Sequence, residues 1–139
     1  MASQSELDRA YIKMAQTWAG LSKAKRKRVG CLIVKDGIII SDGYNGMPKG
    51  FDNDCEYLDA SGLITKPEVL HAESNAITKL AKSTQSSVGG TLYTTASPCI
   101  DCAKLIIQAD ISRVVYKELY KNSVGIDLLK RANILVETC

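Results

Sequence analysis

Residues 91–102 read TLYTTASPCIDC, and this stretch joins a strand pattern to a metal-ligand pattern. Thr91–Thr95 alternates in the way that predicts a β-strand. Cys99 and Cys102 are three residues apart, so one helical turn brings both sulfurs to the same side, within reach of one tetrahedral ion. Pro98 suits the first helical position, where a missing N–H has no cost. The stretch therefore predicts a strand, a helix and metal ligands at their junction.

A second pair of chemically active residues precedes this stretch. His71 is the only histidine of the chain, and Glu73 follows it by two positions. In a helix interior that spacing would place the two side chains roughly 200° apart around the axis, so they share a cavity only near a helix end. His71, Cys99 and Cys102 leave tetrahedral zinc one open position, where the pKa of a bound water falls to about 7. Glu73 is then expected to carry protons rather than to act as a fourth ligand.

The order of these motifs has a known chemical meaning. H-x-E followed by P-C-x-x-C is the signature of zinc nucleobase deaminases, in which hydroxide attacks C4 of cytosine or C6 of adenine. Alone, a Cys-x-x-Cys pair more often marks structural zinc or a redox site. A structural site closes with four protein ligands, and Cys31, Cys55 and Cys139 form no second Cys-x-x-Cys to complete one. A redox role leaves His71 and Glu73 without a task, so one catalytic zinc per chain is predicted.

Composition limits the class of protein. With 139 residues and 45% hydrophobic content, residues 1–139 are expected to form one domain. No apolar run approaches the length of a signal peptide core or a membrane span, so the prediction is a cytoplasmic protein without membrane contact. Five cysteines, two of them assigned to metal, do not form a disulfide framework. A net charge of +3 is too mild for a general polyanion binder.

One local charge cluster is stronger than the net charge suggests. Residues 23–28 read KAKRKR, which puts five cations directly before the apolar strand Val29–Val34. Such runs are usually solvated loops. Because this run abuts a core strand, it can direct one or two cations into a pocket. It is therefore a candidate for binding phosphate, either of a mononucleotide or of a nucleic-acid backbone.

Periodicity and turn signals predict the order of the other elements. Apolar residues recur at helical spacing from Leu7 to Trp18, and Asp36-Gly37 indicates a tight hairpin. Residues 43–66 are rich in Gly, Asp, Asn and Pro and indicate a long irregular connection. The expected elements are a first helix that ends near Gly20, strands 29–35 and 38–41, helix 68–82, strand 91–95, a helix from 98, strand 114–116, helix 126–132 and strand 134–137. Helices alternating with strands after a hairpin predict a mixed α/β sheet flanked by helices.

Three motifs carry a resemblance to a known family: GYNGMPKG at 43–50, HAESNA at 71–76 and SPCIDCAK at 97–104. On these motifs the chain resembles the deoxycytidylate (dCMP) deaminases of the cytidine deaminase superfamily over nearly its whole length. Polynucleotide adenosine deaminases share the zinc motifs but typically lack the Tyr-Asn-Gly-x-Pro run. The resemblance implies a three-layer α/β/α sandwich with a central five-stranded mixed sheet. It also implies assembly into homo-oligomers, often hexamers.

The resemblance implies roles for individual residues. His71, Cys99 and Cys102 match the family's zinc ligands, and Glu73 matches its proton shuttle. The implied substrate-contacting residues are Arg26, Asn45, Ala72, Ser97 and Tyr120. Among them, Asn45 contacts the deoxyribose, Tyr120 helps to hold the nucleotide, and Arg26 binds the 5′-phosphate. Lys25 and Arg28 remain alternatives to Arg26, because the cations crowd one loop. Without the resemblance, Asn45 is better explained as a turn former and Tyr120 as a partly buried aromatic residue.

The implied reaction is hydrolytic deamination of dCMP to dUMP and ammonia, which supplies dUMP for thymidylate synthesis. Two alternatives stay open: a deaminase of cytosine or adenosine in polynucleotides, supported by the basic run, and a non-catalytic zinc-stabilised nucleic-acid-binding module. Flipping a base from a polymer calls for stacking aromatics. The chain has one Trp, one Phe and six Tyr, so no nucleic-acid partner is expected.

Two family features concern regulation and a further metal. Many members are activated by dCTP with Mg²⁺ and inhibited by dTTP, and the sequence leaves open whether this short chain keeps that control. Larger members insert residues, sometimes with another zinc site, before the His-x-Glu motif. Here residues 50–70 hold Cys55 as their only cysteine and no histidine, so a second zinc is not expected.

Overall fold

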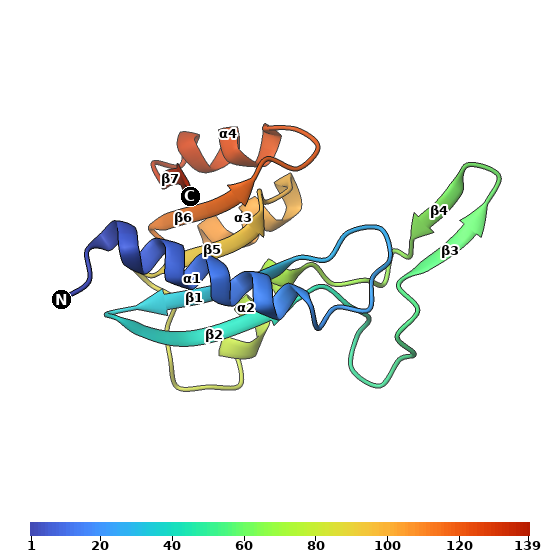
Figure 1. Cartoon of the computed structure of the whole chain (residues 1–139), viewed down its shortest axis with the longest axis horizontal. Coiled ribbons are helices and arrows are strands. Elements are labelled where there is room, and N and C mark those ends of the chain that lie inside the picture. Colours follow the sequence, from blue (N-terminus) through green and yellow to red (C-terminus); the bar gives the residue numbers. More distant parts are fainter.

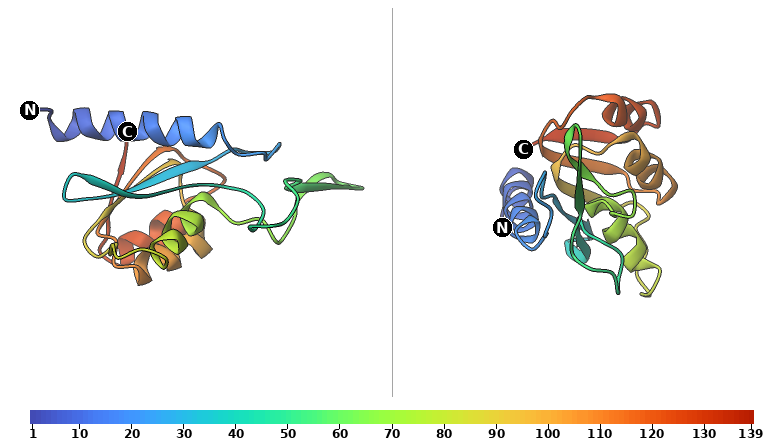
Figure 2. Two further views of the ribbon diagram at one scale, coloured as in Figure 1. Left: turned by 90° about the horizontal axis from the view of Figure 1, so that it is seen from below. Right: turned by 90° about the vertical axis from the view of Figure 1, so that its right-hand side faces the viewer.

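The computed structural model describes residues 1–139 and places a five-stranded sheet between two layers of helices (Figures 1 and 2). The elements are α1 (Gln4–Ala19), β1 (Gly30–Lys35), β2 (Ile38–Tyr44), β3 (Glu56–Asp59), β4 (Gly62–Thr65), α2 (Ala72–Leu80), β5 (Thr91–Ala96), α3 (Ile100–Gln108), β6 (Arg113–Glu118), α4 (Val124–Arg131) and β7 (Leu135–Thr138). The strand order is β2-β1-β5-β6-β7. Strand β1 is antiparallel to both neighbours, whereas β5, β6 and β7 run parallel. The expected mixed sheet is confirmed.

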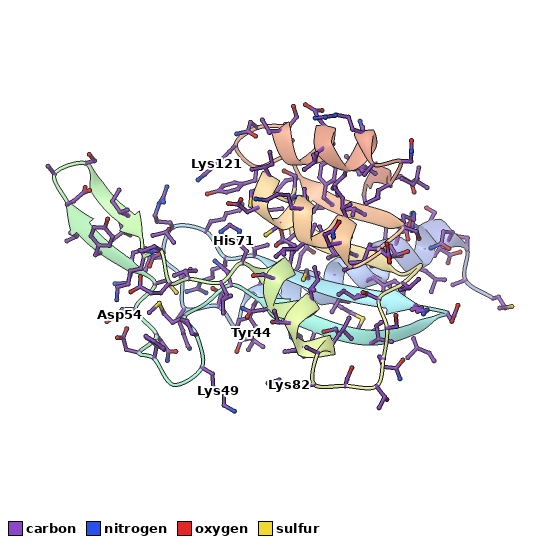
Figure 3. All side chains as sticks on the ribbon, turned by 180° about the vertical axis from the view of Figure 1, so that it is seen from behind. Tyr44, Lys49, Asp54, His71, Lys82 and Lys121 are labelled. Atoms are coloured by element: carbon purple, nitrogen blue, oxygen red, sulfur yellow. The ribbon has the colours of Figure 1, made fainter.

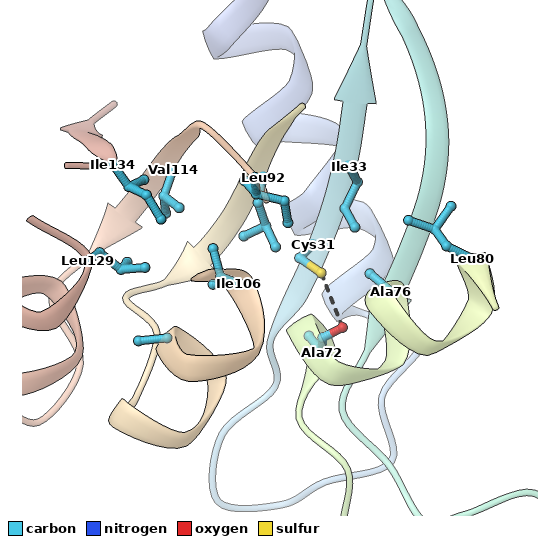
Figure 4. Packing of buried hydrophobic residues seen from close by; sticks show 12 residues of the cluster. Cys31, Ile33, Ala72, Ala76, Leu80, Leu92, Ile106, Val114, Leu129 and Ile134 are labelled. Carbon is cyan, nitrogen blue, oxygen red and sulfur yellow. Dashed lines mark hydrogen bonds between the residues drawn. The ribbon is translucent and has the colours of Figure 1, made fainter. Parts of the chain in front are cut away.

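Strand β1 is covered on both faces, which explains its continuous apolar sequence. Cys31 and Ile33 belong to the core cluster shared with α2, α3 and α4 (Figure 4). Leu32 and Val34 belong to the cluster shared with α1 on the opposite face. Figure 2 shows α1 alone on one side of the sheet and the other three helices on the other. The period of two along β1 therefore assigns each side chain to one helical layer.

Polar contacts attach α1 to the sheet. Asp8 receives a hydrogen bond of 2.6 Å from Tyr93 Oη and an ion pair of 2.6 Å from Arg113 Nη2. Arg113 also contacts Glu137 on β7 at 2.6 Å. Because these residues come from α1, β5, β6 and β7, the network ties the helix across three strands. None of the helices is long and apolar enough to cross a membrane.

The prediction of an irregular connection over residues 43–66 is wrong in part. Strand β2 continues to Tyr44, and β3 and β4 pair as an antiparallel hairpin, a protruding arm that extends from the body of the molecule (Figure 1). At the base of the arm, the N–H of Lys66 donates to the carbonyl of Cys55 at 2.8 Å. These strands have four residues each and no face packed on the core, so they carry no strong alternation.

The predicted starts of the two helices that carry the metal ligands also differ from the structure. Helix α2 begins at Ala72 rather than Glu68, because Leu70 pairs with Gly46 in an isolated β-bridge and is held extended. Helix α3 begins at Ile100, with Cys99 as its extended N-cap, so Pro98 lies outside the helix instead of at its first position. Both shifts place a site residue at the start of a helix rather than inside it.

Candidate metal centre and substrate cavity

The starts of α2 and α3 bring three metal-binding side chains together. His71 and Cys99 are the N-cap residues of the two helices, with extended backbones at φ −74°, ψ 158° and φ −73°, ψ 173°. An N-cap side chain usually bonds to its own helix, but neither of these does. Instead, His71 Nδ1 lies 3.4 Å from Cys99 Sγ and 3.3 Å from Cys102 Sγ. The three ligand atoms all lie within 4.8 Å of one another.

The donor set and its surroundings fit zinc. One imidazole nitrogen and two sulfurs are ligands that Zn²⁺ prefers in a tetrahedral site. Hydrogen bonds from the Cys102 thiol and from the His71 ring lower the pKa of Cys99 to about 4. The positive ends of two helix dipoles lie at the same place and favour a thiolate further. These contacts therefore favour a thiolate at Cys99, the form in which a cysteine binds a metal ion.

Glu73 completes the centre as a buried carboxyl group. It is the second residue of α2, only 4% exposed, and it lines one cavity together with His71 and Cys99. Burial raises the pKa of Glu73 above its usual value. A carboxyl group of raised pKa accepts a proton more readily and can return it in a later step. Placed beside the metal ligands, it is suited to proton transfer at a zinc-activated water.

The start of α2 is held by the sheet behind it. Cys31 of β1 donates its S–H to the carbonyl oxygen of Ala72 at 3.1 Å (Figure 4). A Cβ at Gly43 of β2 would lie 2.4 Å from the same oxygen, so only glycine allows this approach. These contacts fix the backbone between His71 and Glu73. The cysteine acts here as a small buried residue.

The cavity at the metal centre brings together the residues expected to contact the substrate. Its lining includes Arg26, Asn45, Ala72, Ser97 and Tyr120. Cys102 is buried and does not line it. Of the two alternative cations, neither Lys25 nor Arg28 lines the cavity, and Arg28 Nε donates instead to the carbonyl of Ala24 at 3.2 Å.

Asn45 connects the end of β2 to the basic loop, residues 23–28. Its Nδ2 donates to the carbonyl of Lys27 at 2.8 Å, and its Oδ1 accepts the N–H of Val29 at 2.9 Å. Ser97 also lines the cavity, and its Oγ accepts the N–H of Tyr120 at 2.8 Å. Both polar side chains therefore shape the cavity through backbone contacts.

Sequence analysis named Lys27 only as one of five cations of the basic loop and missed Lys121 and Asn122; all three line the cavity. The ammonium groups of Lys27 and Lys121 lie 5.4 and 5.3 Å from the centre of the Tyr120 ring. Lys27 also pairs with Glu118. Lys121 has a φ of 65°, which turns the chain sharply after Tyr120. In Figure 3, Lys121 and His71 both lie toward the protruding arm. The only available signal was that Lys121 and Asn122 directly follow Tyr120 in the sequence.

A glycine supports the metal ligands from behind. A Cβ at Gly125, in the first turn of α4, would lie 2.1 Å from the carbonyl oxygen of Pro98 and 2.8 Å from the carbonyl carbon of Cys99. The helix therefore rests directly on the peptide that carries a metal ligand. This contact joins α4 to the Pro98–Cys99 peptide, which is distant from it in the sequence.

The three-layer fold and this centre define a zinc-dependent hydrolytic deaminase, in which a cation site opens onto a cavity beside a buried carboxyl group. The family model of the cytidine and deoxycytidylate deaminase zinc-binding region matches residues 5–118. The chain belongs to this family.

Individual relatives agree with the family assignment. The deoxycytidylate deaminase of Enterobacteria phage T4 is 37% identical, and the alignment covers 98% of this chain and 89% of the phage protein. The deoxycytidylate deaminase of Saccharomyces cerevisiae is 34% identical over 93% of this chain, which spans 43% of the yeast protein. The crystal structure of dCMP deaminase from cyanophage S-TIM5, in complex with dCMP and dUMP, is 42% identical. It has a TM-score of 0.93, covering 99% of this chain and 100% of that one.

Proposed function

We propose that residues 1–139 act as a single domain that converts dCMP and water to dUMP and ammonia, supplying dUMP for thymidylate synthesis. The observation that carries the proposal is that Arg26 lines the same cavity as His71, Cys99 and Glu73. A cation and metal-binding side chains that line one cavity suit a phosphorylated pyrimidine nucleotide. The deoxycytidylate deaminases of phage T4 and yeast support the same substrate.

The residues divide the chemistry in a simple way. His71, Cys99 and Cys102 hold zinc, which when bound supplies a Lewis acid that lowers the pKa of a water ligand to about 7. Glu73 accepts a proton as the water oxygen forms a bond to C4 of cytosine. The same carboxyl group passes this proton to N3. It then takes the proton of the new C4 hydroxyl and delivers it to the amino group, so the C4=O of uracil forms as the C4–N bond breaks and ammonia is released. Burial raises the pKa of Glu73, which favours its protonated form and so supports its role as proton carrier.

The rest of the nucleotide is assigned to the other lining residues. Ala72 and Ser97 contact the base, and Asn45 contacts the deoxyribose through the lone pair that Oδ1 keeps after accepting the N–H of Val29. Tyr120 packs on the nucleotide, and Arg26 binds the 5′-phosphate. Arginine presents a planar fork of donors that matches phosphate.

The test compares dCMP with deoxycytidine in wild type and in Arg26→Ala. A charge-assisted contact to phosphate is worth about 1.5–3 kcal/mol, so wild type should prefer dCMP by roughly one to two decades in kcat/KM. Arg26→Ala should remove most of that preference, and Arg26→Lys should be intermediate. Lys25→Ala is the matched control, because it removes a cation of the same loop that does not line the cavity. Equal efficiency on both substrates in all variants would contradict the phosphate assignment.

A parallel assay addresses the polynucleotide alternative. One tyrosine and no Trp or Phe lines the cavity, so there is no aromatic pair to stack on a flipped base. Short single strands containing cytosine should therefore be poor substrates. If they were turned over better than dCMP, with affinity that falls steeply as salt rises, the basic loop would be a backbone-binding surface instead.

We also propose two finer properties that the family resemblance suggests. The chain forms homo-oligomers, hexamers being the family expectation, and works in the cytoplasm. Its protruding arm is a two-stranded hairpin with Leu58 78% exposed, and isolated hairpins of this size are marginally stable unless they pack on something. Sedimentation of the purified protein measures the assembly. Kinetics with dCTP and Mg²⁺, and with dTTP, measure whether these effectors act on it.

A further inference from the structure

Glu56, at the base of the protruding arm, holds the loop that carries Arg26. Its Oε2 accepts the backbone N–H of Lys25 at 2.8 Å and of Arg26 at 3.0 Å. One carboxylate oxygen therefore binds two consecutive amides, which are 31 and 30 residues earlier in the chain. Hydrogen bonds to a charged acceptor are about twice as strong as neutral ones. Glu56 makes no ion pair, so these two amides are its partners.

Thr65 holds the other end of the same arginine. Glu56 and Thr65 face each other in the hairpin register, as the first pair of the arm. Arg26 Nη1 donates to Thr65 Oγ1 at 3.2 Å. The guanidinium group has five donors, and this contact uses one, so the others stay free for a ligand. The pair therefore restrains the backbone and the side chain of Arg26 together.

The arm is fixed to the body at this position. Cys55 is 1% exposed, and its carbonyl accepts the N–H of Lys66 at 2.8 Å, which closes the hairpin below Glu56 and Thr65. All three residues, Cys55, Glu56 and Thr65, line the substrate cavity. The support for Arg26 is thus part of the cavity wall and does not depend on the exposed tip of the arm.

The charge of Glu56 makes its role testable. A carboxylate that lines a phosphate-binding cavity repels a phosphate ligand, so on charge alone its removal should improve the binding of a nucleotide. A free arginine side chain has many rotamers, and restraining it before the ligand arrives improves binding. If repulsion dominates, removing Glu56 strengthens the binding of a nucleotide, and if the restraint of Arg26 dominates, it weakens that binding. One substitution of Glu56 therefore distinguishes the two effects.

We propose that Glu56 and Thr65 are positioning residues that set the preference for a 5′-phosphorylated substrate by holding Arg26. This inference rests on the proposed function and deepens it. Neither residue takes part in the chemistry at the metal centre, so their effect should be confined to the phosphate end of the substrate.

The experiment measures kcat and KM for dCMP and for deoxycytidine. Glu56→Ala should raise the KM for dCMP about tenfold while kcat stays within about twofold, since loss of one charge-assisted contact corresponds to roughly a decade. Its kinetics with deoxycytidine should match wild type. Glu56→Gln should retain part of the effect, because an amide oxygen still accepts one N–H. Glu68→Gln is the control, an exposed carboxyl group that makes no hydrogen bond or ion pair.

Thr65 provides a second, milder test that keeps the carboxylate. Thr65→Val should raise the KM for dCMP about threefold, and Thr65→Ser should restore it, because serine keeps the hydroxyl acceptor. If Glu56→Ala does not fold, Glu56→Gln and the Thr65 variants carry the test. Zinc content and melting temperature are measured for each variant to separate loss of fold from loss of positioning.

A double-mutant cycle with Arg26→Ala decides whether Glu56 acts through the arginine. In the Arg26→Ala background, Glu56→Ala should have no further effect on the KM for dCMP. An equal effect in both backgrounds, a lower KM in Glu56→Ala, or an equal loss on deoxycytidine would each overturn the inference. If wild type did not prefer dCMP at all, the proposed function itself would fail. If Arg26→Ala lost the preference and every Glu56 and Thr65 variant kept it, the positioning role alone would fail.

Discussion

Replacing Gly125 with alanine should weaken zinc binding from a distance. The new Cβ would lie 2.1 Å from the carbonyl oxygen of Pro98, and real Cβ contacts essentially never fall below 3.0 Å. The start of α4 and the Pro98–Cys99 peptide must therefore separate by about 0.9 Å, the difference of the two values. Both partners are backbone, so no flexible side chain can give way. Ligand distances in a metal site are held within about 0.2 Å, so this shift is large for Cys99.

The expected size of the effect follows from the contacts of Cys99. Its carbonyl accepts the N–H of Ala103 at 2.9 Å, so moving the peptide also strains the first turn of α3, where Cys102 lies. Overpacking of this kind costs roughly 1–3 kcal/mol of stability. Changes in residues that orient metal ligands typically cost about 10–100-fold in metal affinity. We expect Gly125→Ala to lower the free energy of unfolding by about 1–3 kcal/mol and the zinc affinity by about 10–100-fold.

The assay is competition for zinc against a chelator of known affinity, with thermal unfolding measured alongside. Gly30→Ala is the matched control, because its Cβ would lie 2.0 Å from the carbonyl oxygen of Ala15 in α1, on the face of the sheet away from the metal ligands. It should lose similar stability and keep wild-type zinc affinity. Wild-type affinity in Gly125→Ala would refute the reasoning, and equal weakening in both variants would show a general loss of fold instead.

Three shorter predictions concern the centre and the fold. Glu73→Gln should keep about one zinc per chain and lower kcat by roughly 10²–10⁴-fold, because it removes proton transfer; substantial remaining turnover would contradict that role. Cys102→Ala should lose zinc by elemental analysis, and full occupancy would show that its sulfur is not a ligand. The pKa of Asp8 is lowered from 3.8 to about 2, chiefly by Arg113, so its carboxylate stabilises the fold by about 2 kcal/mol above pH 4. A group whose pKa is lowered by folding stabilises the protein less as pH falls, because its carboxylate becomes protonated. The difference in unfolding free energy between wild type and Asp8→Asn should therefore be constant at pH 5–7 and shrink toward pH 2. A difference that does not depend on pH would refute this role of Asp8.

Much of the molecule could be predicted because its signals are local. Asp36 and Gly37 have φ of 51° and 74°, the left-handed values that a tight hairpin needs and that this pair readily adopts. Alternating strands and helices predicted the mixed sheet, since a buried strand and an amphipathic helix each carry their own periodicity. The spacing of His71 and Glu73 required a helix end, and the structure has one there.

What the tertiary structure alone decided depends on contacts between distant segments. The bridge between Gly46 and Leu70 delays α2 until Ala72, and no local pattern near Glu68 contains that pairing. The choice of Arg26 and Lys27 as lining cations, in place of Lys25 and Arg28, depends on how the basic loop is bent.

Contacts between distant segments also explain why the sequence did not predict the role of the arm or the support of the metal ligands. Glu56 looks like one more polar residue in an irregular stretch until β3 pairs with β4 and places it against the amides of the basic loop. Gly125 looks like an ordinary helical glycine until α4 packs on the Pro98–Cys99 peptide. Residue types and their spacing determine the ligands and the chemistry, because those properties belong to short segments. The residues that surround the metal ligands and line the cavity are decided by tertiary packing, because their contacts join segments that are far apart in the sequence.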